Sequence, residues 1–375
     1  MASWKSTGTY VDAVPPYGAN IVDVVWIFKV KRPPGSPPAF KARYVSRGFT
    51  QRQGVNYFQT FSPTPKMTTL WVLLHVATER DYELRSLDFS TAFLQVRLHE
   101  EILLHRPPGF TGSFPAGTQW SLRQPVYGLS QAPRKWHDTR STTLAALGFT
   151  HSIAEPSLFL RTVTLLPPFY ILVYINDLVF ATGDTEALTL VKLELQKRHT
   201  CTDLGKLRSY LGLQITRERA RRTITLTKSH MVHQVLQRFG FHFSLPQPTP
   251  LSTGLLLSAP PSNESIEPSG CFTSGMGLVL GGWGPVVLSG HADASWVDDS
   301  ATQRSSQGYT FSLGAMAAQE LRWPTYLLTD LREQPRSPPV LYVDNKAMIV
   351  LCQEHRLEHR TKHIALRYFL ARELQ

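Results

Sequence analysis

The sequence predicts a mixed fold of the α+β or α/β class in both halves of the chain. Three kinds of pattern predict it: short apolar runs rich in β-branched residues, longer stretches with helical periodicity, and turn residues between them. Strands followed by helices are typical of sheets that bury one or both faces under helices. Because 375 residues exceed one ordinary core, we expect at least two domains.

The N-terminal half begins with a predicted strand over residues 22–30 and a partner strand over residues 42–45. The proline-rich stretch from Arg32 to Pro38 lies between them. Because proline is excluded from a central strand, this stretch is expected to be the loop that joins the two strands. Helices are expected where apolar residues recur on one helical face. Pro133 suits a first helical turn, Gly148 a C-cap and Asp184 an N-cap. The expected helices span residues 66–80, 133–148, 184–199 and 230–239.

The C-terminal third is less regular. Residues 244–271 are rich in Pro, Ser and Thr and lose apolar periodicity, which predicts a linker or a damaged segment. Short strands are expected beyond it, over residues 277–280, 286–288, 308–313 and 340–343. Asp293 and Asp344 follow two of these strands.

Composition restricts the partners and the compartment. The net charge of +11 and the pI near 9.6 favour a polyanionic partner over a merely solvated basic surface. Cys201, Cys271 and Cys352 stand singly and fit neither a disulfide framework nor a paired-cysteine metal site. We therefore expect an intracellular protein, of the cytoplasm or the nucleus. No apolar run of ~18 residues is present, so no membrane partner is expected.

Two acidic positions point to chemistry. Residues 170–180 read as a buried hairpin with Asn176 and Asp177 at its tip, and Asp88 ends a short apolar strand upstream. Acids on adjacent strand ends can hold two Mg²⁺ ions for in-line phosphoryl transfer. Lys41 and Arg43 lie in a basic hairpin that suits a triphosphate or a nucleic-acid backbone, although a charged edge that blocks aggregation is an alternative.

Several blocks in this order resemble the copia-type retrotransposon reverse transcriptase. They lie at residues 26–32, 40–45, 48–51, 60–63, 87–94, 127–133, 203–205 and 210–212. The resemblance implies an RNA-directed DNA polymerase with an α+β right-hand fold of fingers, palm and thumb over residues 1–243. It also implies a ribonuclease H-like α/β domain over residues 272–375, which here looks incomplete.

The resemblance also implies roles for the acidic and aromatic residues of the palm. Asp88 resembles the first metal-binding carboxylate, and Asn176 and Asp177 stand where the family carries two aspartates. Phe93 resembles the aromatic residue that screens against a 2′-hydroxyl on the incoming nucleotide. The implied cofactor is Mg²⁺, with Mn²⁺ as the alternative. The implied partners are an RNA template, a DNA primer and deoxynucleoside triphosphates.

Further roles follow from the same resemblance. Lys41 and Arg43 are expected to clamp the triphosphate, and Tyr127 and Gly128 to pack beside the nascent base pair. The turn formed by Tyr210, Leu211 and Gly212 resembles the primer-gripping hairpin. In the ribonuclease H-like remnant, Asp293 and Asp344 match two of the carboxylates.

The sequence departs from the family pattern in ways that weaken the predicted activity. Asn176 replaces a metal-binding aspartate, and losing that charge is expected to lower the rate by about 10³ or more. Asp177 is a candidate substitute. A long connection after the proline-rich stretch is missing, and no acid lies between Gly314 and Ala317, so RNA cleavage is not expected. Residues 355–363 carry three regularly spaced histidines, for which a solvated helix is favoured over Zn²⁺ binding.

Three functional hypotheses therefore remain. The chain is a weak or inactive polymerase, a non-catalytic nucleic-acid-binding remnant, or a translated fossil without function. Primer extension separates the first from the others. Salt-dependent binding to RNA–DNA hybrids separates the second from the third.

Overall fold

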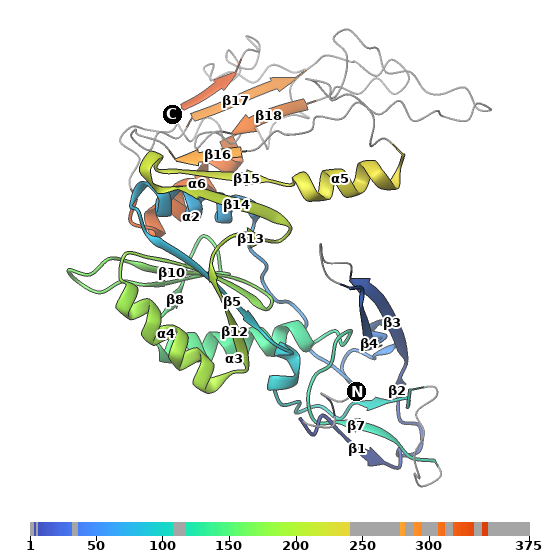
Figure 1. Ribbon diagram of the computed structural model, residues 1–375. Helices are drawn as coiled ribbons and strands as arrows, with labels where there is room; N and C mark the ends of the chain where they lie inside the picture. Colours follow the sequence, from blue (N-terminus) through green and yellow to red (C-terminus); the bar gives the residue numbers. More distant parts are fainter. Residues whose placement is uncertain are drawn as a thin grey trace, which may run out of the picture. The chain divides into compact units, whose positions relative to one another are not determined.

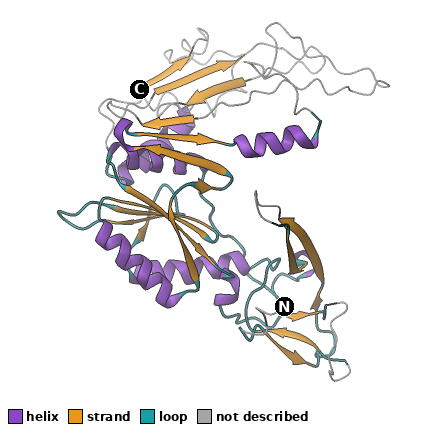
Figure 2. Ribbon diagram, viewed as in Figure 1, coloured by secondary structure: helices purple, strands orange, loops and turns teal. Residues whose placement is uncertain are grey.

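The computed structural model describes residue 4 and residues 7–31, 37–107, 117–240, 278–281, 289–294, 307–311, 318–333 and 340–343. The chain divides into two compact units. Unit 1 comprises Met1–Pro65, Arg85–His151 and Pro156–Gly205, and unit 2 comprises Lys66–Leu84, Ser152–Glu155 and Lys206–Gln375. Each unit mixes helices with strands, in agreement with the predicted mixed class (Figures 1 and 2).

A six-stranded sheet forms the centre of unit 1. Its strands, in spatial order, are β12 (Cys201–Lys206), β5 (Glu83–Phe89), β11 (Asp177–Thr182), β10 (Phe169–Tyr174), β9 (Leu158–Arg161) and β8 (Thr150–His151). The helices α3 (Ala132–Ala146) and α4 (Thr185–Arg198) cover one face of this sheet (Figure 1). Pro133 lies in the first turn of α3, and the Asp184 side chain caps α4 by accepting from the Ala187 amide at 2.8 Å, as the sequence predicted.

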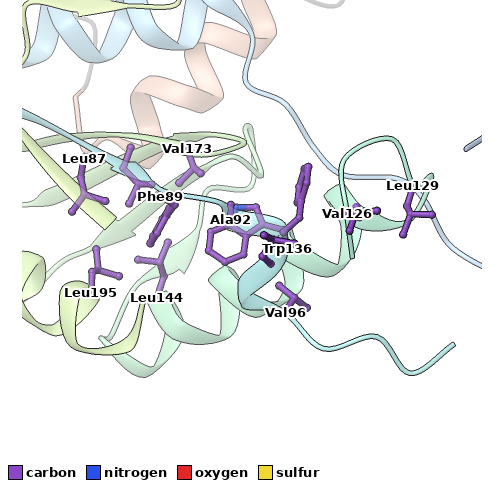
Figure 3. Close-up of a cluster of buried hydrophobic side chains, with 14 of the residues drawn as sticks. Leu87, Phe89, Ala92, Val96, Val126, Leu129, Trp136, Leu144, Val173 and Leu195 are labelled. Atoms are coloured by element: carbon purple, nitrogen blue, oxygen red, sulfur yellow. The ribbon is translucent and has the colours of Figure 1, made fainter. Parts of the chain in front are cut away.

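Side chains from the sheet and both helices make one apolar core. Val173 of β10 and Leu87 and Phe89 of β5 meet Trp136 of α3 and Leu195 of α4 in this cluster (Figure 3). All five of these side chains are at most 1% exposed. Burial of this kind stabilises the fold by about 1.5–3 kcal/mol for each large apolar side chain, so β5 and β11 are held on a rigid support.

The register of β10 with β11 corrects the predicted hairpin tip. Val173 pairs with Leu178 and Tyr174 pairs with Asp177, which leaves only Ile175 and Asn176 in the turn. The prediction that Asn176 and Asp177 form the tip is therefore wrong by one residue. Burial of the apolar pair decides the register, because a shift by one residue would move Val173 and Leu178 to the opposite face.

Unit 1 contains two further sheets, whose strands all come from the first 122 residues of the chain. One has the strand order β1 (Tyr10–Ala13), β7 (Gln119–Leu122), β6 (Leu103–Leu104) and β2 (Ile21–Val22). The other is the hairpin of β3 (Val24–Lys31) and β4 (Ala39–Ser46). The predicted strand over residues 22–30 is thus divided, because Val22 pairs with Leu104 in a different sheet from Val24 onward. Short 3₁₀ turns, η1 (Gly48–Thr50) and η2 (Ala92–Gln95), follow β4 and β5.

Unit 2 is built on the helix α2 (Met67–Glu79) and a four-stranded sheet. The strand order is β13 (Ser209–Tyr210), β14 (Leu213–Glu218), β15 (Thr223–Thr227) and β16 (Leu278–Gly281). The 3₁₀ turn η3 (Arg219–Arg221) joins β14 to β15, and α5 (Ser229–Arg238) follows β15. Both helices lie where helical periodicity predicted them.

The far C-terminal part contributes β17 (Ser289–Ala294), β18 (Gln307–Phe311), α6 (Ala318–Asp330) and β19 (Val340–Val343). β17 pairs antiparallel with β18 and parallel with β19. The strand predicted at residues 286–288, the predicted linker at 244–271, and the histidines of residues 355–363 lie outside the described residues. Within the residues that are described, no helix is long and apolar enough to cross a membrane.

Parts of the chain beyond residue 243 belong to the core of unit 2. The Trp323 indole donates to the Ala154 carbonyl at 2.8 Å, and the Asp330 carboxylate accepts from the Ala154 amide at 3.1 Å. Arg80, at the end of α2, makes two bonds of 2.8 Å with Glu333. The elements α6 and β16 therefore pack with elements from the first half of the chain within unit 2.

Replacing Leu328 with alanine tests whether α6 is part of that core. Leu328 is 0% exposed, so the change is expected to lower the free energy of unfolding of unit 2 by about 2–4 kcal/mol. Denaturant unfolding measures the change, and amide exchange in α2 locates it. The matched control is Tyr326→Ala on the same helix, where the side chain is 58% exposed. An equal effect of the two variants would contradict the assignment.

Candidate active site

Two aspartates lie on adjacent strands of the central sheet. Asp88 is the second-last residue of β5, and Asp177 is the first residue of β11, its neighbour in the sheet. Both residues are half-buried, and no hydrogen bond or ion pair of either side chain is found with the residues that the structure describes. Burial and, after it, the negative charge of Asp88 raise the pKa of Asp177. The structure thus brings these two predicted residues within electrostatic range of each other.

Asn176 links the hairpin turn to the strand that carries Asp88. Its backbone carbonyl accepts from the Phe89 amide at 2.9 Å, and its side-chain amide donates to the Tyr127 hydroxyl at 3.4 Å. Its side-chain oxygen, Oδ1, is buried and has no donor within the described part of the chain. A buried acceptor without a donor is uncommon in a native fold and is a position where a cation or water is expected.

Phe93 and Tyr127 extend this group of contacts. Phe93 lies in η2 and is 6% exposed, and its ring meets the Tyr127 ring edge-to-face with centroids 4.8 Å apart. Thr91, which precedes η2, adopts a left-handed conformation with φ 49° and so bends the chain sharply after β5. The site residues predicted at 88, 93, 127, 176 and 177 therefore lie in one connected neighbourhood.

Gly128 is packed against the end of β4. The Ser46 amide donates to the Tyr127 carbonyl at 2.9 Å, and Gly128 has φ +94°. A Cβ atom at position 128 would lie 1.9 Å from the Ser46 carbonyl oxygen, so only glycine permits this approach. Lys41 and Arg43 lie further along β4, about 10–17 Å from Ser46 at the rise of an extended strand, and are exposed.

The predicted primer-gripping turn lies in unit 2. Tyr210 is 5% exposed and pairs with Leu213, so Leu211 and Gly212 form a two-residue hairpin turn. Both have positive φ, 48° and 81°, as a type I′ turn requires. Of the ribonuclease H-like remnant, Asp293 lies in β17, and Asp344 is outside the described residues.

Sequence reasoning missed three residues that organise the site. The Gln95 side chain bonds both the amide and the carbonyl of Thr200 at 2.9 Å, which ties η2 to the start of β12. Trp136 and Arg140 of α3 both donate to the carbonyl of Ile175, each at 2.9 Å. Their spacing by four residues places them on one helix face, which was the available signal, but the target is a backbone atom that no pattern reveals.

The oxygen atoms of this site are of the kind that a hard divalent cation binds, although one of the three is neutral. Asp88 and Asp177 offer carboxylates, and Asn176 offers a neutral amide oxygen, all of which Mg²⁺ accepts. No group of three or more His, Cys, Asp or Glu side chains suited to a metal ion occurs among the described residues. The donor set is therefore one negative charge short of a three-carboxylate site.

The raised pKa of Asp177 predicts a pH dependence of cation binding. Because the proton leaves this carboxylate at a higher pH than usual, protons are expected to compete with Mn²⁺ at pH values above the ordinary Asp range. The same shift means that ionising Asp177 opposes folding, so without a cation the contribution of Asp177 to the free energy of unfolding becomes less favourable as pH rises from its ordinary pKa through the raised value. Mn²⁺ titrations across pH, with Asp177→Asn as control, measure the effect. A pH-independent affinity would contradict it.

Comparison with known proteins identifies the family. The model of the family "Reverse transcriptase (RNA-dependent DNA polymerase)" matches residues 8–253. The chain belongs to this reverse transcriptase family. The resemblance to the copia-type enzymes noted from the sequence is thereby confirmed, and the matched region contains Asp88, Asn176 and Asp177.

Relatives of the chain include plant transposon polyproteins. It is 29% identical to the retrovirus-related Pol polyprotein from transposon RE2 of Arabidopsis thaliana, over 96% of this chain and 30% of the relative. It is 27% identical to that from transposon TNT 1-94 of Nicotiana tabacum, over 100% of this chain and 34% of the relative. The chain thus spans about a third of the length of these polyproteins.

Among solved structures, the chain is similar to the foamy viral protease–reverse transcriptase in complex with double-stranded DNA. The TM-score is 0.34 and the identity 13%, over 65% of this chain and 35% of the other. A similarity this weak supports no conclusion about fold or ligand.

Proposed function

We propose that this chain is a template-directed DNA polymerase that copies RNA and works slowly because of Asn176. The observation that carries the proposal is the Asp88–Asp177 pair, two carboxylates on adjacent strands without a positive partner among the described residues. The family match supplies the reaction class. The RNA template, the DNA primer and deoxynucleoside triphosphates are the proposed partners, met in the cytoplasm or the nucleus.

Asp88 and Asp177 would hold the divalent cation, with the Asn176 Oδ1 atom as a neutral third donor. When bound, Mg²⁺ or Mn²⁺ would activate the primer hydroxyl and neutralise charge on the triphosphate. The residues themselves orient the reaction. The carbonyl of Asn176 fixes the turn to β5 through the Phe89 amide, so both carboxylates keep one geometry.

The neighbouring residues receive the nucleotide in this proposal. Phe93, supported edge-on by Tyr127, would close the space beside the sugar and so disfavour a 2′-hydroxyl. Lys41 and Arg43 would neutralise the triphosphate, and the turn at Tyr210, Leu211 and Gly212 would hold the primer. These elements would correspond to the palm, fingers and thumb of a right-hand polymerase, followed by an incomplete ribonuclease H-like domain that does not cleave RNA.

A second candidate, a non-catalytic nucleic-acid binder, is favoured by the two faces of the β3–β4 hairpin. The register puts Phe28 and Phe40 on one face, where they are 75% and 85% exposed. Lys29, Lys41 and Arg43 share the other face. Exposed rings beside a basic strand suit stacked bases and phosphates without sequence readout.

One variant separates the two candidates. Replacing Asp88 with asparagine is expected to abolish primer extension on an RNA template while leaving hybrid binding, and its steep loss with salt, within about twofold of the native chain. Asp184→Asn, which alters only the cap of α4, is the control. Extension that survives Asp88→Asn would overturn the polymerase proposal. Extension absent even from the native chain, with salt-dependent binding intact, would favour the binder.

The comparisons also support the proposed loss of chain. The alignment with the RE2 polyprotein runs over 434 positions, although this chain has only 375 residues, so the relative contains residues with no counterpart here. A shortened chain would weaken activity independently of Asn176. The same primer-extension experiment tests the hypothesis of a fossil without function, which expects no extension.

A further inference from the structure

The turn before Asp177 has a strained backbone. Ile175 adopts φ 51°, a left-handed conformation that is unfavourable for a β-branched residue. Strain of this kind costs about 1–3 kcal/mol and persists only where the surroundings impose it. The Ile175 side chain is 39% exposed, so its own packing does not impose the conformation.

Two buried side chains of α3 hold this turn instead. The Trp136 indole and the Arg140 guanidinium each donate to the Ile175 carbonyl at 2.9 Å. Trp136 is 1% exposed and Arg140 is 3% exposed. A carbonyl that accepts from a neutral and a charged donor in a buried setting is strongly fixed, because the charged bond is roughly twice as strong as a neutral one.

Trp136 also contacts the strand that carries Asp88. Its ring meets the Phe89 ring edge-to-face with centroids 4.9 Å apart, and Phe89 follows Asp88 directly. The Phe89 amide in turn donates to the Asn176 carbonyl at 2.9 Å. One side chain therefore touches both the strand of Asp88 and the turn that precedes Asp177.

We propose that Trp136 and Arg140 are positioning residues that set the separation of the Asp88 and Asp177 carboxylates by clamping the Ile175 carbonyl. This inference rests on the proposed function, because the separation matters when the pair binds a divalent cation. Neither residue touches the cation or the substrate. Removing one donor lets Ile175 relax towards an ordinary conformation and rotates the first residues of β11 away from β5.

Mn²⁺ binding to the full chain, followed by electron paramagnetic resonance, tests the positioning role. Trp136→Phe keeps an aromatic ring and removes the N–H, and Arg140→Met keeps an unbranched side chain as far as the Nε position and removes the charged donor. Each is expected to weaken Mn²⁺ binding about tenfold. Arg140→Lys, which restores one charged donor, is expected to recover part of that loss. Trp120→Phe, a buried tryptophan of β7, is the matched control and should bind as the native chain does.

A second measurement needs no metal. Exchange of the Phe89 amide is expected to accelerate about tenfold in Trp136→Phe, while the Leu122 amide, bonded to Ile102 at 2.8 Å, exchanges as before. Unchanged Phe89 exchange, or native Mn²⁺ affinity in both variants, would overturn the clamp. If the native chain binds no Mn²⁺, the proposed function fails, and Phe89 exchange alone then decides whether the two donors hold the turn.

Discussion

Asn176→Asp is expected to raise the rate of primer extension by about 10³. The Asn176 Oδ1 atom is buried, has no donor among the described residues, and belongs to the residue that precedes Asp177, so an aspartate would place a negative oxygen where only a neutral one now lies. Mg²⁺ prefers anionic oxygen, and the added charge would strengthen its binding before and during the reaction. Steady-state extension on an RNA template, with Mg²⁺ and then with Mn²⁺, measures the gain.

The same substitution predicts a change in stability of opposite sign. Three carboxylates in one half-buried neighbourhood repel one another, so the free energy of unfolding should fall in a metal chelator and recover when Mg²⁺ is added. Asn176→Ala, which removes the side-chain oxygen, is the control and should gain no activity. No extension from Asn176→Asp would assign the loss to the missing chain instead, and full activity of the native chain would show that Asn176 is not a lesion.

Gly128→Ala is expected to destabilise unit 1 by about 3 kcal/mol or more. The new Cβ would lie 1.9 Å from the Ser46 carbonyl oxygen and 2.7 Å from Val45 Cγ1, and its φ of +94° is unfavourable for alanine. The Ser46 carbonyl oxygen is a backbone atom and cannot move aside as the end of a flexible side chain can. The variant must therefore separate β4 from Tyr127 and break the 2.9 Å bond between Ser46 and the Tyr127 carbonyl.

Gly54→Ala is the matched control for this prediction. Gly54 has φ +79° and no atom within 4 Å of the added Cβ, so its alanine variant measures the conformational effect alone, about 1–2 kcal/mol. Denaturant unfolding of both variants gives the difference. Equal free energies of unfolding for the two variants would show that the contact between Gly128 and β4 does not form.

Much of the secondary structure followed from local signals. The helix from Asp184 was predictable because its cap and its basic last turn act over a few residues, and the structure reproduces both. The hairpin of β10 and β11 was predictable from two apolar runs, but its tip was not. Register depends on which residues of both strands are buried, and the burial of Val173 against Leu178 decided it.

The residues of the candidate site were likewise predictable only in part. Motif order placed Asp88, Phe93, Tyr127, Asn176 and Asp177 in one expected site, and the structure brings these five together. Trp136, Arg140 and Gln95 were missed because they act on backbone atoms of distant segments, whose position no local pattern encodes. The packing of α6 into unit 2 was missed for a related reason, since its hydrogen-bond partner Ala154 lies far away in the sequence.

The sequence by itself determined the family, the positions of the helices α2 to α5, and the presence of an amide where a carboxylate is expected. These are properties of residue type and short-range spacing. Only the tertiary structure decided that Asp177 approaches Asp88, that the Asn176 side-chain oxygen has no donor among the described residues, and that α3 donates to the turn between the strands. Those outcomes depend on contacts between residues 35–90 positions apart, which form only when the core is packed.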